Sequence, residues 1–247
     1  MRTIKIIVEY DGYDYHGWQR QKNRLTVQQV LEEKIGIIAD EKIKVVGSGR
    51  TDAGVHALNQ VAHFKTSSKL ESDRLCYGIN SLLPADIVIK QLTEVGDDFH
   101  AQNDAASKTY LYRIYNRPVR SVLHRHYAWH IPYALDVKQM QEAACLIIGP
   151  HDFSSFCATG TDVATRDRTV ISVDIESGAD GFISIWVEAT GFLRYMVRNI
   201  VGTLVDVGRG KITPGNFRDI LHARDRTKAG PTAPPYGLFL KDVKYLP

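Results

Sequence analysis

Length and composition place the chain among ordinary folded proteins. It has 247 residues, of which 44% are hydrophobic and 24% are charged, and a chain of this size buries a large core as one big domain or as two small ones. The net charge of +3 is too small to indicate a nucleic-acid binder by itself. The three isolated cysteines, Cys76, Cys145 and Cys157, form no CxxC pair. They argue against a disulfide framework or a cysteine zinc site and favour a reducing compartment.

The amino-terminal segment gives no sign of export or of membrane insertion. Residues Met1 to Gly12 alternate between charged and apolar side chains and lack the apolar core of a signal peptide. No apolar run in the sequence is long enough to span a bilayer. We therefore expect a cytosolic protein without a membrane partner.

The first half of the chain has the pattern of alternating strands and helices. Arg2 to Tyr10 alternates in the manner of a strand, and Thr26 begins a stretch whose apolar residues recur at helical spacing. Further strands are expected at Lys42 to Val46, Val61 to Thr66, Ile87 to Val95 and Lys108 to Tyr115, with a helix at Leu70 to Leu83 that Pro84 ends. The order β-α-β-β-α-β is that of a ferredoxin-like unit, a pattern shared by the common RNA-recognition module.

The second half repeats this order of elements without a convincing sequence repeat. The expected strands are Ala128 to Ile131, Thr169 to Glu176, Phe182 to Thr190 and Leu238 to Tyr245, and the expected helices are Asp136 to Ile148, Phe192 to Val207 and one that Thr213 caps. We predict an α+β protein of two ferredoxin-like halves that form one extended, mainly antiparallel sheet, with helices on one face and a central cleft at the junction. The boundary is expected in Asn116 to Arg125, which gives halves of residues 1–116 and 117–247.

Basic residues concentrate in one part of the second half. The segment from Gly191 to Gly230 holds eight Lys or Arg against three Asp. Clustered cations neutralise phosphates and release counterions, although a solvated helical face would carry the same charge. The polar stretch from Cys157 to Arg168 lacks periodicity and is expected to be a mobile loop.

The stretch from Gly47 to His56 (GSGRTDAGVH) is the most informative part of the sequence. It holds one carboxylate, Asp52, one guanidinium, Arg50, and three glycines, directly after an apolar run. Glycine lets the backbone turn sharply and approach a ligand closely, so Asp52 is a candidate nucleophile. Thr-Asp-Ala-Gly is also an ordinary turn sequence. A phosphate-binding loop is a further alternative, which the missing Lys-Ser/Thr ending argues against.

This stretch resembles the signature of the tRNA pseudouridine synthase A family, the pseudouridine synthases of the tRNA anticodon arm. Other stretches resemble further blocks of the same family: Tyr10 to Gly12, Gly17 to Gln21, Ser107 to Arg113, Gly191 to Gly202, and Arg226 to Leu238. The matches run along nearly the whole chain and are weakest between Ser121 and Asp180. Tyr236 stands where the family more often has His.

The resemblance implies three catalytic residues. Asp52 matches the nucleophile, and Arg198 matches the arginine that pairs with that carboxylate, as a guanidinium can in a two-pronged hydrogen-bonded pair. Tyr110 matches the substrate-binding tyrosine, whose ring can stack on a flipped uracil and whose hydroxyl could take part in the C5 proton transfer. By themselves, the patterns favour a surface arginine on a basic helix and an aromatic residue in the core of a sheet.

The resemblance also implies residues that bind the RNA. We expect Arg50 to occupy the space that the flipped base leaves and Leu238 to pack against that base. Because of their charge, and not from the resemblance, we expect Arg194, Arg226 and Lys228 to bind phosphates. Flipping a base out of a stem costs a few kcal/mol, which contacts in the pocket offset. The alternative for the segment from Arg226 to Pro235 is a linker that proline stiffens.

As a whole, the resemblance implies an isomerase that converts uridine to pseudouridine at positions 38, 39 and 40 of tRNA, in the anticodon stem and loop. The chemistry needs no metal or other cofactor, and the family implies a homodimer. The main alternative is a non-catalytic RNA-binding protein with tandem RNA-recognition-like folds, although the glycine-aromatic signature of such modules is missing. A metal-dependent hydrolase built on His124, His126 and His130 is weaker, because no second set of ligands is recognisable.

Overall fold

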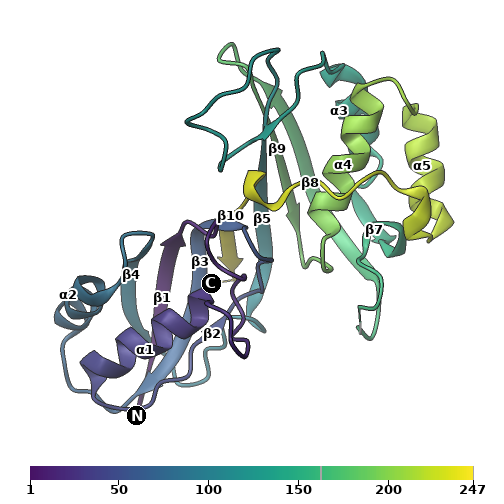
Figure 1. Cartoon of the computed structure of the whole chain (residues 1–247). Helices are drawn as coiled ribbons and strands as arrows, with labels where there is room; N and C mark the ends of the chain where they lie inside the picture. The colour runs from purple at the N-terminus through teal and green to yellow at the C-terminus, as the bar shows by residue number, and fades with distance from the viewer. Residues whose placement is uncertain (162, 247) are drawn as a thin grey trace. The chain divides into compact units, whose positions relative to one another are not determined.

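The computed structural model describes residues 1–161 and 163–246, and in these ranges it contains ten strands and five α-helices (Figure 1). The predicted α+β class is confirmed. The chain divides into two compact units. The first comprises Met1–Ala106 and Leu240–Pro247, and the second comprises Ser107–Phe239. None of the described helices is long and apolar enough to cross a membrane.

The first unit has the strand order of a ferredoxin-like fold. Its elements are β1 (Arg2–Tyr10), α1 (Val27–Ala39), β2 (Val46–Gly47), β3 (His56–Thr66), α2 (Ser72–Leu82), β4 (Ile87–Val95) and the end of β10 (Leu238–Tyr245). The order β4-β1-β3 is antiparallel throughout, β2 pairs with one end of β3, and β10 also neighbours β3. The sheet's core side chains include Ile4, Ile6 and Val8, which alternate along β1 and are fully buried. The helices α1 and α2 pack on each other.

The predicted strand at Lys42 to Val46 is wrong, because only Val46 and Gly47 pair with β3. The backbone of Val45 finds its partners on the side chains of α1 instead. Its N–H donates to Glu32 Oε1 at 3.2 Å, and its carbonyl accepts from Gln28 Nε2 at 2.7 Å. Buried backbone groups need partners, and here helix side chains satisfy groups that a sheet ladder would otherwise pair.

The second unit contains a mainly antiparallel sheet with three helices. Its elements are most of β5 (Ala105–Tyr115), β6 (Trp129–His130), α3 (Val137–Cys145), β7 (Gly149–Asp152), β8 (Asp167–Ser177), β9 (Phe182–Ala189), α4 (Met196–Gly208) and α5 (Pro214–Ala223). The strand order is β5-β9-β8-β7, and β6 pairs with β5. The three helices pack on one another beside β7 and β8 (Figure 1).

The division of the chain differs from the predicted halves of residues 1–116 and 117–247. The strand β5 pairs with β9 along eight residues, from Lys108 to Tyr115, whereas the expected first strand of the second half, β6, is only two residues long. The second unit therefore begins at Ser107, and the chain from Leu240 onward belongs to the first unit. Asp162, in the predicted mobile loop, lies outside the described residues.

Candidate active site

A tight turn presents Asp52. The N–H of Val55 donates to Asp52 O at 3.2 Å, and Gly54 has a φ of +76°. The turn is fastened to the N-terminal segment by two further backbone bonds, from Trp18 N to Thr51 O at 3.1 Å and from Gly54 N to Tyr15 O at 3.2 Å. The ordinary turn that Thr-Asp-Ala-Gly predicts is therefore present, and it holds the half-buried Asp52 in a fixed backbone setting.

Two glycines of the N-terminal segment let it lie directly against this turn. A Cβ on Gly17, whose φ is +85°, would lie 2.5 Å from Thr51 O, and a Cβ on Gly12 would lie 1.9 Å from Val55 O. Contacts this short do not occur, so a side chain at either position would push the turn away. In the sequence blocks at Tyr10 to Gly12 and Gly17 to Gln21, glycine is therefore needed so that the N-terminal segment can pack against the Asp52 turn.

We expect Gly17→Ala to lower the free energy of unfolding by about 1 to 3 kcal/mol, because it adds backbone strain at a positive φ and a clash with Thr51. Any activity that depends on Asp52 should fall as well, because Asp52 moves with the turn. Urea denaturation measures the first effect. Gly215→Ala in α5 is the control, because a Cβ there meets only Thr213 Oγ1, at an ordinary 3.5 Å. Equal stability of the two variants would contradict this account of the turn.

Buried hydroxyl and amide side chains form hydrogen bonds that hold the segment before Asp52 in place. The hydroxyls of Tyr10 and Thr51 lie 2.8 Å apart, and burial raises the pKa of Tyr10 well above its usual value, so this phenol stays protonated. Ser48 donates to Gln60 Oε1 at 2.7 Å, and Gln60 Nε2 donates to Gly49 O at 3.0 Å. These bonds fix the backbone on the amino-terminal side of Asp52, since a buried polar group is costly to leave without its partner.

Arg50 is exposed two residues before Asp52, and its Nε donates to Gln19 Oε1 at 3.1 Å. The family resemblance and its place in the loop single out Arg50, whereas nothing in the sequence assigns a role to Gln19. A single glutamine far from the loop in sequence carries no pattern that would predict this contact.

In the second unit, Arg198 lies on the first turn of α4 and is half-buried. Its Nε donates to Ala233 O at 2.8 Å, and Ala233 N donates to Arg198 O at 3.0 Å. Its guanidinium carbon lies 4.7 Å from the centroid of the Tyr195 ring. Both the backbone and the side chain of Arg198 are thus joined to the segment that leads into β10, which restricts the directions in which the guanidinium can point.

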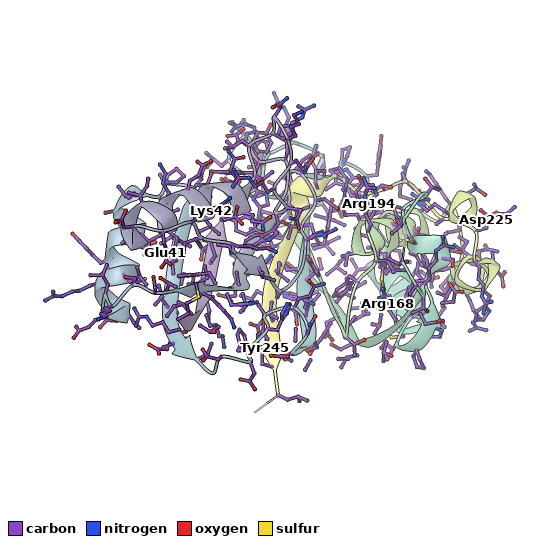
Figure 2. The ribbon with its side chains drawn as sticks, turned by 90° about the horizontal axis from the view of Figure 1, so that it is seen from below. Glu41, Lys42, Arg168, Arg194, Asp225 and Tyr245 are labelled. Atoms are coloured by element: carbon purple, nitrogen blue, oxygen red, sulfur yellow. The ribbon has the colours of Figure 1, made fainter. Side chains whose placement is uncertain are left out.

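The helix expected from Phe192 begins only at Met196, so the earlier start is wrong. Tyr195 has a φ of +64°, a left-handed conformation that a helix interior does not tolerate, and α4 starts directly after it. Arg194 therefore does not share a helical surface with Arg198. Both guanidinium groups nevertheless lie on the Tyr195 ring, Arg194 at 4.8 Å from its centroid. Arg194 is exposed and is labelled in Figure 2.

Tyr110 and Leu238 are both nearly buried. Tyr110, on β5, is 7% exposed and makes an edge-on contact with Phe192, with the ring centroids 4.9 Å apart. Leu238, at the start of β10, is 5% exposed. Such burial is typical of side chains that pack in a protein core. Tyr112, two residues further along β5, is fully buried, and its hydroxyl donates to Pro234 O at 2.9 Å.

The two cations predicted after α5 have different surroundings. Lys228 is exposed. Arg226 is half-buried, and its guanidinium donates to Asn199 Oδ1 at 3.0 Å, Thr232 Oγ1 at 3.0 Å and Ala229 O at 3.2 Å. Asn199 is fully buried on α4. Arg226 therefore fastens its own loop to α4, a role that the sequence did not reveal because the two partners lie far apart along the chain.

Two of the three histidines of the hydrolase alternative, His124 and His130, make contacts within the second unit. The His124 ring meets Phe182 edge-on with the centroids 4.8 Å apart, and His130 Nε2 lies 2.9 Å from Arg117 O. Across residues 1–161 and 163–246, no group of three or more His, Cys, Asp or Glu side chains has the arrangement of a metal site.

Comparison with known proteins decides the family. A family model described as tRNA pseudouridine synthase matches residues 6–104 and 143–246. The chain belongs to this family. It is 51% identical to a tRNA pseudouridine synthase A of Thermoanaerobacter sp. (strain X514), over 99% of this chain and 100% of that protein. It is 44% identical to one of Bacillus subtilis (strain 168), over 98% of each chain.

A solved structure, "Structure of H/ACA RNP bound to a substrate RNA containing 2'-deoxyuridine", contains a chain that aligns with 82% of this one at 10% identity. The TM-score is 0.39, and the alignment covers 44% of that chain, which is less than half of its length.

Family membership assigns the reaction. The protein is an isomerase that converts uridine in tRNA to pseudouridine, and the alternative of a non-catalytic RNA-binding protein is not favoured. Asp52 and Arg50 share one loop of the first unit. Tyr110, Arg198 and the segment leading to Leu238 belong to the second.

Proposed function

We propose that this pseudouridine synthase modifies uridines in the anticodon stem and loop of tRNA with Asp52 as its nucleophile. The observation that carries the proposal is the Asp52 turn. Its backbone is bonded to the N-terminal segment through Thr51 and Gly54, and the glycines Gly12 and Gly17 leave room for that contact. A carboxylate in such a setting has little freedom to lose when it reacts, which is the purpose of a preorganised site.

The reaction is an intramolecular transfer of uracil and is balanced without a cofactor. The glycosidic bond between N1 and C1′ breaks, and a new bond forms between C5 and C1′. The C5 proton leaves, and N1 gains a proton. A carboxylate is ionised at neutral pH and is able to act as a nucleophile at C6 or at C1′, or to promote a route through a glycal. Asp52 fits each route.

We propose that Arg198 orients this carboxylate. A two-pronged pair with a carboxylate uses two N–H groups of the guanidinium fork. The Nε of Arg198 donates to Ala233 O, so we assign the pair with Asp52 to the Nη groups. The Tyr195 ring and the Ala233 bond hold the plane of the guanidinium, and lysine would supply the charge without the fork.

The flipped base needs a pocket to hold it, and the stem needs a side chain that fills the space the base leaves. We propose that Tyr110 stacks on the uracil and that its hydroxyl serves the C5 proton transfer, with Leu238 packed on the base. Arg50 takes the space that the base vacates. The edge contact between Tyr110 and Phe192 supports this assignment, because it fixes the ring plane on which the base would stack.

We assign the phosphate contacts to Arg194 and Lys228, which are exposed. Arg226 was expected to join them, but its three protein acceptors support a role in holding the loop that carries Lys228. Loss of the hydrogen bonds of Arg226 would therefore displace Lys228 as well.

The combined variant Arg194→Ala and Lys228→Ala is expected to reduce the slope of log affinity against log salt by about 2, about one for each lost phosphate contact. Filter binding of tRNA between low and moderate salt measures the slope. Lys69→Ala with Arg74→Ala, two exposed cations of the first unit to which we assign no RNA contact, is the control. A slope that both double variants leave unchanged would count against the phosphate assignment.

We propose that the enzyme acts in the cytosol as a homodimer whose two subunits bind one tRNA together. Sedimentation of the protein alone and with tRNA tests this assembly. We expect a dimer in the absence of RNA and two chains per tRNA in the complex. A monomer that converts tRNA at the full rate would contradict it.

The substrate proposal is tested by incubating the protein with unmodified tRNA and mapping every pseudouridine. We expect new pseudouridine only at uridines of the anticodon stem and loop. Conversion elsewhere in the tRNA, with these uridines untouched, would contradict the proposed target while leaving the family reaction intact.

A further inference from the structure

Two glutamine side chains connect Arg50 to helix α1. Gln19 Oε1 accepts a hydrogen bond from Arg50 Nε at 3.1 Å, and Gln19 Nε2 donates to Gln28 Oε1 at 2.8 Å. All three residues belong to the first unit. These two hydrogen bonds therefore link a side chain of α1 to Arg50, which precedes Asp52 by two residues.

Backbone groups fix the orientation of the side-chain amide of Gln28, and through it the orientation of Gln19. Gln28 is buried, its Oε1 accepts from Arg20 N at 2.8 Å, and its Nε2 donates to Val45 O at 2.7 Å. A backbone N–H cannot accept and a carbonyl cannot donate, so the amide of Gln28 has one orientation. Its Oε1 then requires the Nε2 of Gln19, and the Oε1 of Gln19 is left to face Arg50.

The acceptor that Arg50 meets is neutral. A carboxylate in this place would form an ion pair and would lower the attraction of Arg50 for RNA. An amide oxygen holds the Nε without cancelling the charge. Gln19 is the sole hydrogen-bond partner that the Arg50 guanidinium has among the described residues, so its Nη edge keeps its donors for the nucleic acid.

We infer that Gln19 is a positioning residue that aims Arg50 into the stem, with Gln28 fixing its orientation. The inference rests on the proposed role of Arg50. Preorganising a long side chain removes an entropic cost that would otherwise fall on the step in which the base leaves the stem. Gln19 should therefore act on conversion of bound tRNA and little on binding.

The test is a double-mutant cycle of Gln19→Met and Arg50→Ala, with single-turnover conversion and tRNA affinity measured for each variant. Met keeps the volume of Gln without its polar atoms. We expect Gln19→Met to slow conversion about 10-fold, the size of a hydrogen bond to a charged group, with affinity changed less than 3-fold. In the Arg50→Ala background the same substitution should cost nothing further, because Gln19 acts only through Arg50.

Gln21→Met is the matched control, since Gln21 lies in the same segment, is exposed and contacts His16 O. If Gln19→Met does not fold, Gln19→Asn replaces it, because the shorter amide cannot span from Gln28 to Arg50. Independent losses from Gln19 and Arg50 would overturn the inference and leave the role of Arg50 standing. A fully active Arg50→Ala would refute both the inference on Gln19 and the proposed role of Arg50. Activity of Asp52→Asn would instead refute the proposed nucleophile.

Discussion

Asp52→Asn is expected to reduce tritium release from tRNA carrying 5-tritiated uridine by at least about 10⁴-fold, the scale on which enzymes lose activity when a nucleophile is removed. An amide is a poor nucleophile, and its nearly equal size leaves the turn between Thr51 and Val55 in place. Affinity for tRNA should stay within severalfold, because one carboxylate contributes no attraction to a polyanion.

Asp40→Asn is the matched control for this prediction. Asp40 is exposed, ends α1 in a left-handed conformation with a φ of +52°, and lies in the same unit. Asparagine also adopts that conformation readily, so the control should keep full activity and stability. Wild-type release by Asp52→Asn would refute the assignment of the nucleophile.

Arg198→Ala is expected to lower the rate of pseudouridine formation at saturating tRNA by about 10² to 10³-fold, comparable to the loss of one oriented hydrogen-bond donor in an active site. The loss should appear in kcat more than in KM, because the side chain is proposed to orient Asp52. Arg198→Lys should restore little of the rate, since an ammonium keeps the charge but loses the two-pronged geometry.

The control for Arg198 is Arg209→Ala. Arg209 follows α4 directly and is exposed, and like Arg198 its guanidinium lies on a tyrosine ring, here 4.8 Å from the centroid of Tyr133. Removing it takes away the same charge and a similar stacking contact far along the helix. An Arg198→Ala enzyme that turns over normally once tRNA is saturating would leave only a binding role for this arginine.

Most of the strands and helices could be predicted because their signals are local. The strands β1 and β4 were both predicted with their observed ends, β1 from the alternation of its side chains. Thr26 and Thr213 start α1 and α5 because each hydroxyl accepts from a backbone N–H three residues ahead, and a threonine before an apolar periodic run signals this.

The errors arose where distant groups decide the backbone. Val45 bonds to side chains of α1 instead of to a strand, and no property of Lys42 to Val46 reveals those partners. Tyr195 takes a left-handed conformation before α4, although nothing in its residue type favours it. Tertiary context overrides local preference at both places.

The candidate site, like the fold, could be predicted from the sequence only in part. The loop of Asp52 and Arg50 could be singled out because its ten residues are contiguous and resemble a family signature. The side chains that hold the proposed site residues and the Arg226 loop could not, since Gln19, Gln28 and Asn199 are single amides whose partners lie elsewhere in the chain. Arg226, predicted from its charge, proved to bind three protein oxygens.

The role of the Asp52 carboxylate is tested most directly by a single turnover with the enzyme in excess over tRNA, so that every RNA is bound before the reaction is quenched. The wild-type enzyme should convert the target uridines completely. The complex of tRNA with Asp52→Asn should form to the same extent and contain no pseudouridine over many wild-type half-lives. Conversion at the wild-type rate within that saturated complex would contradict the account.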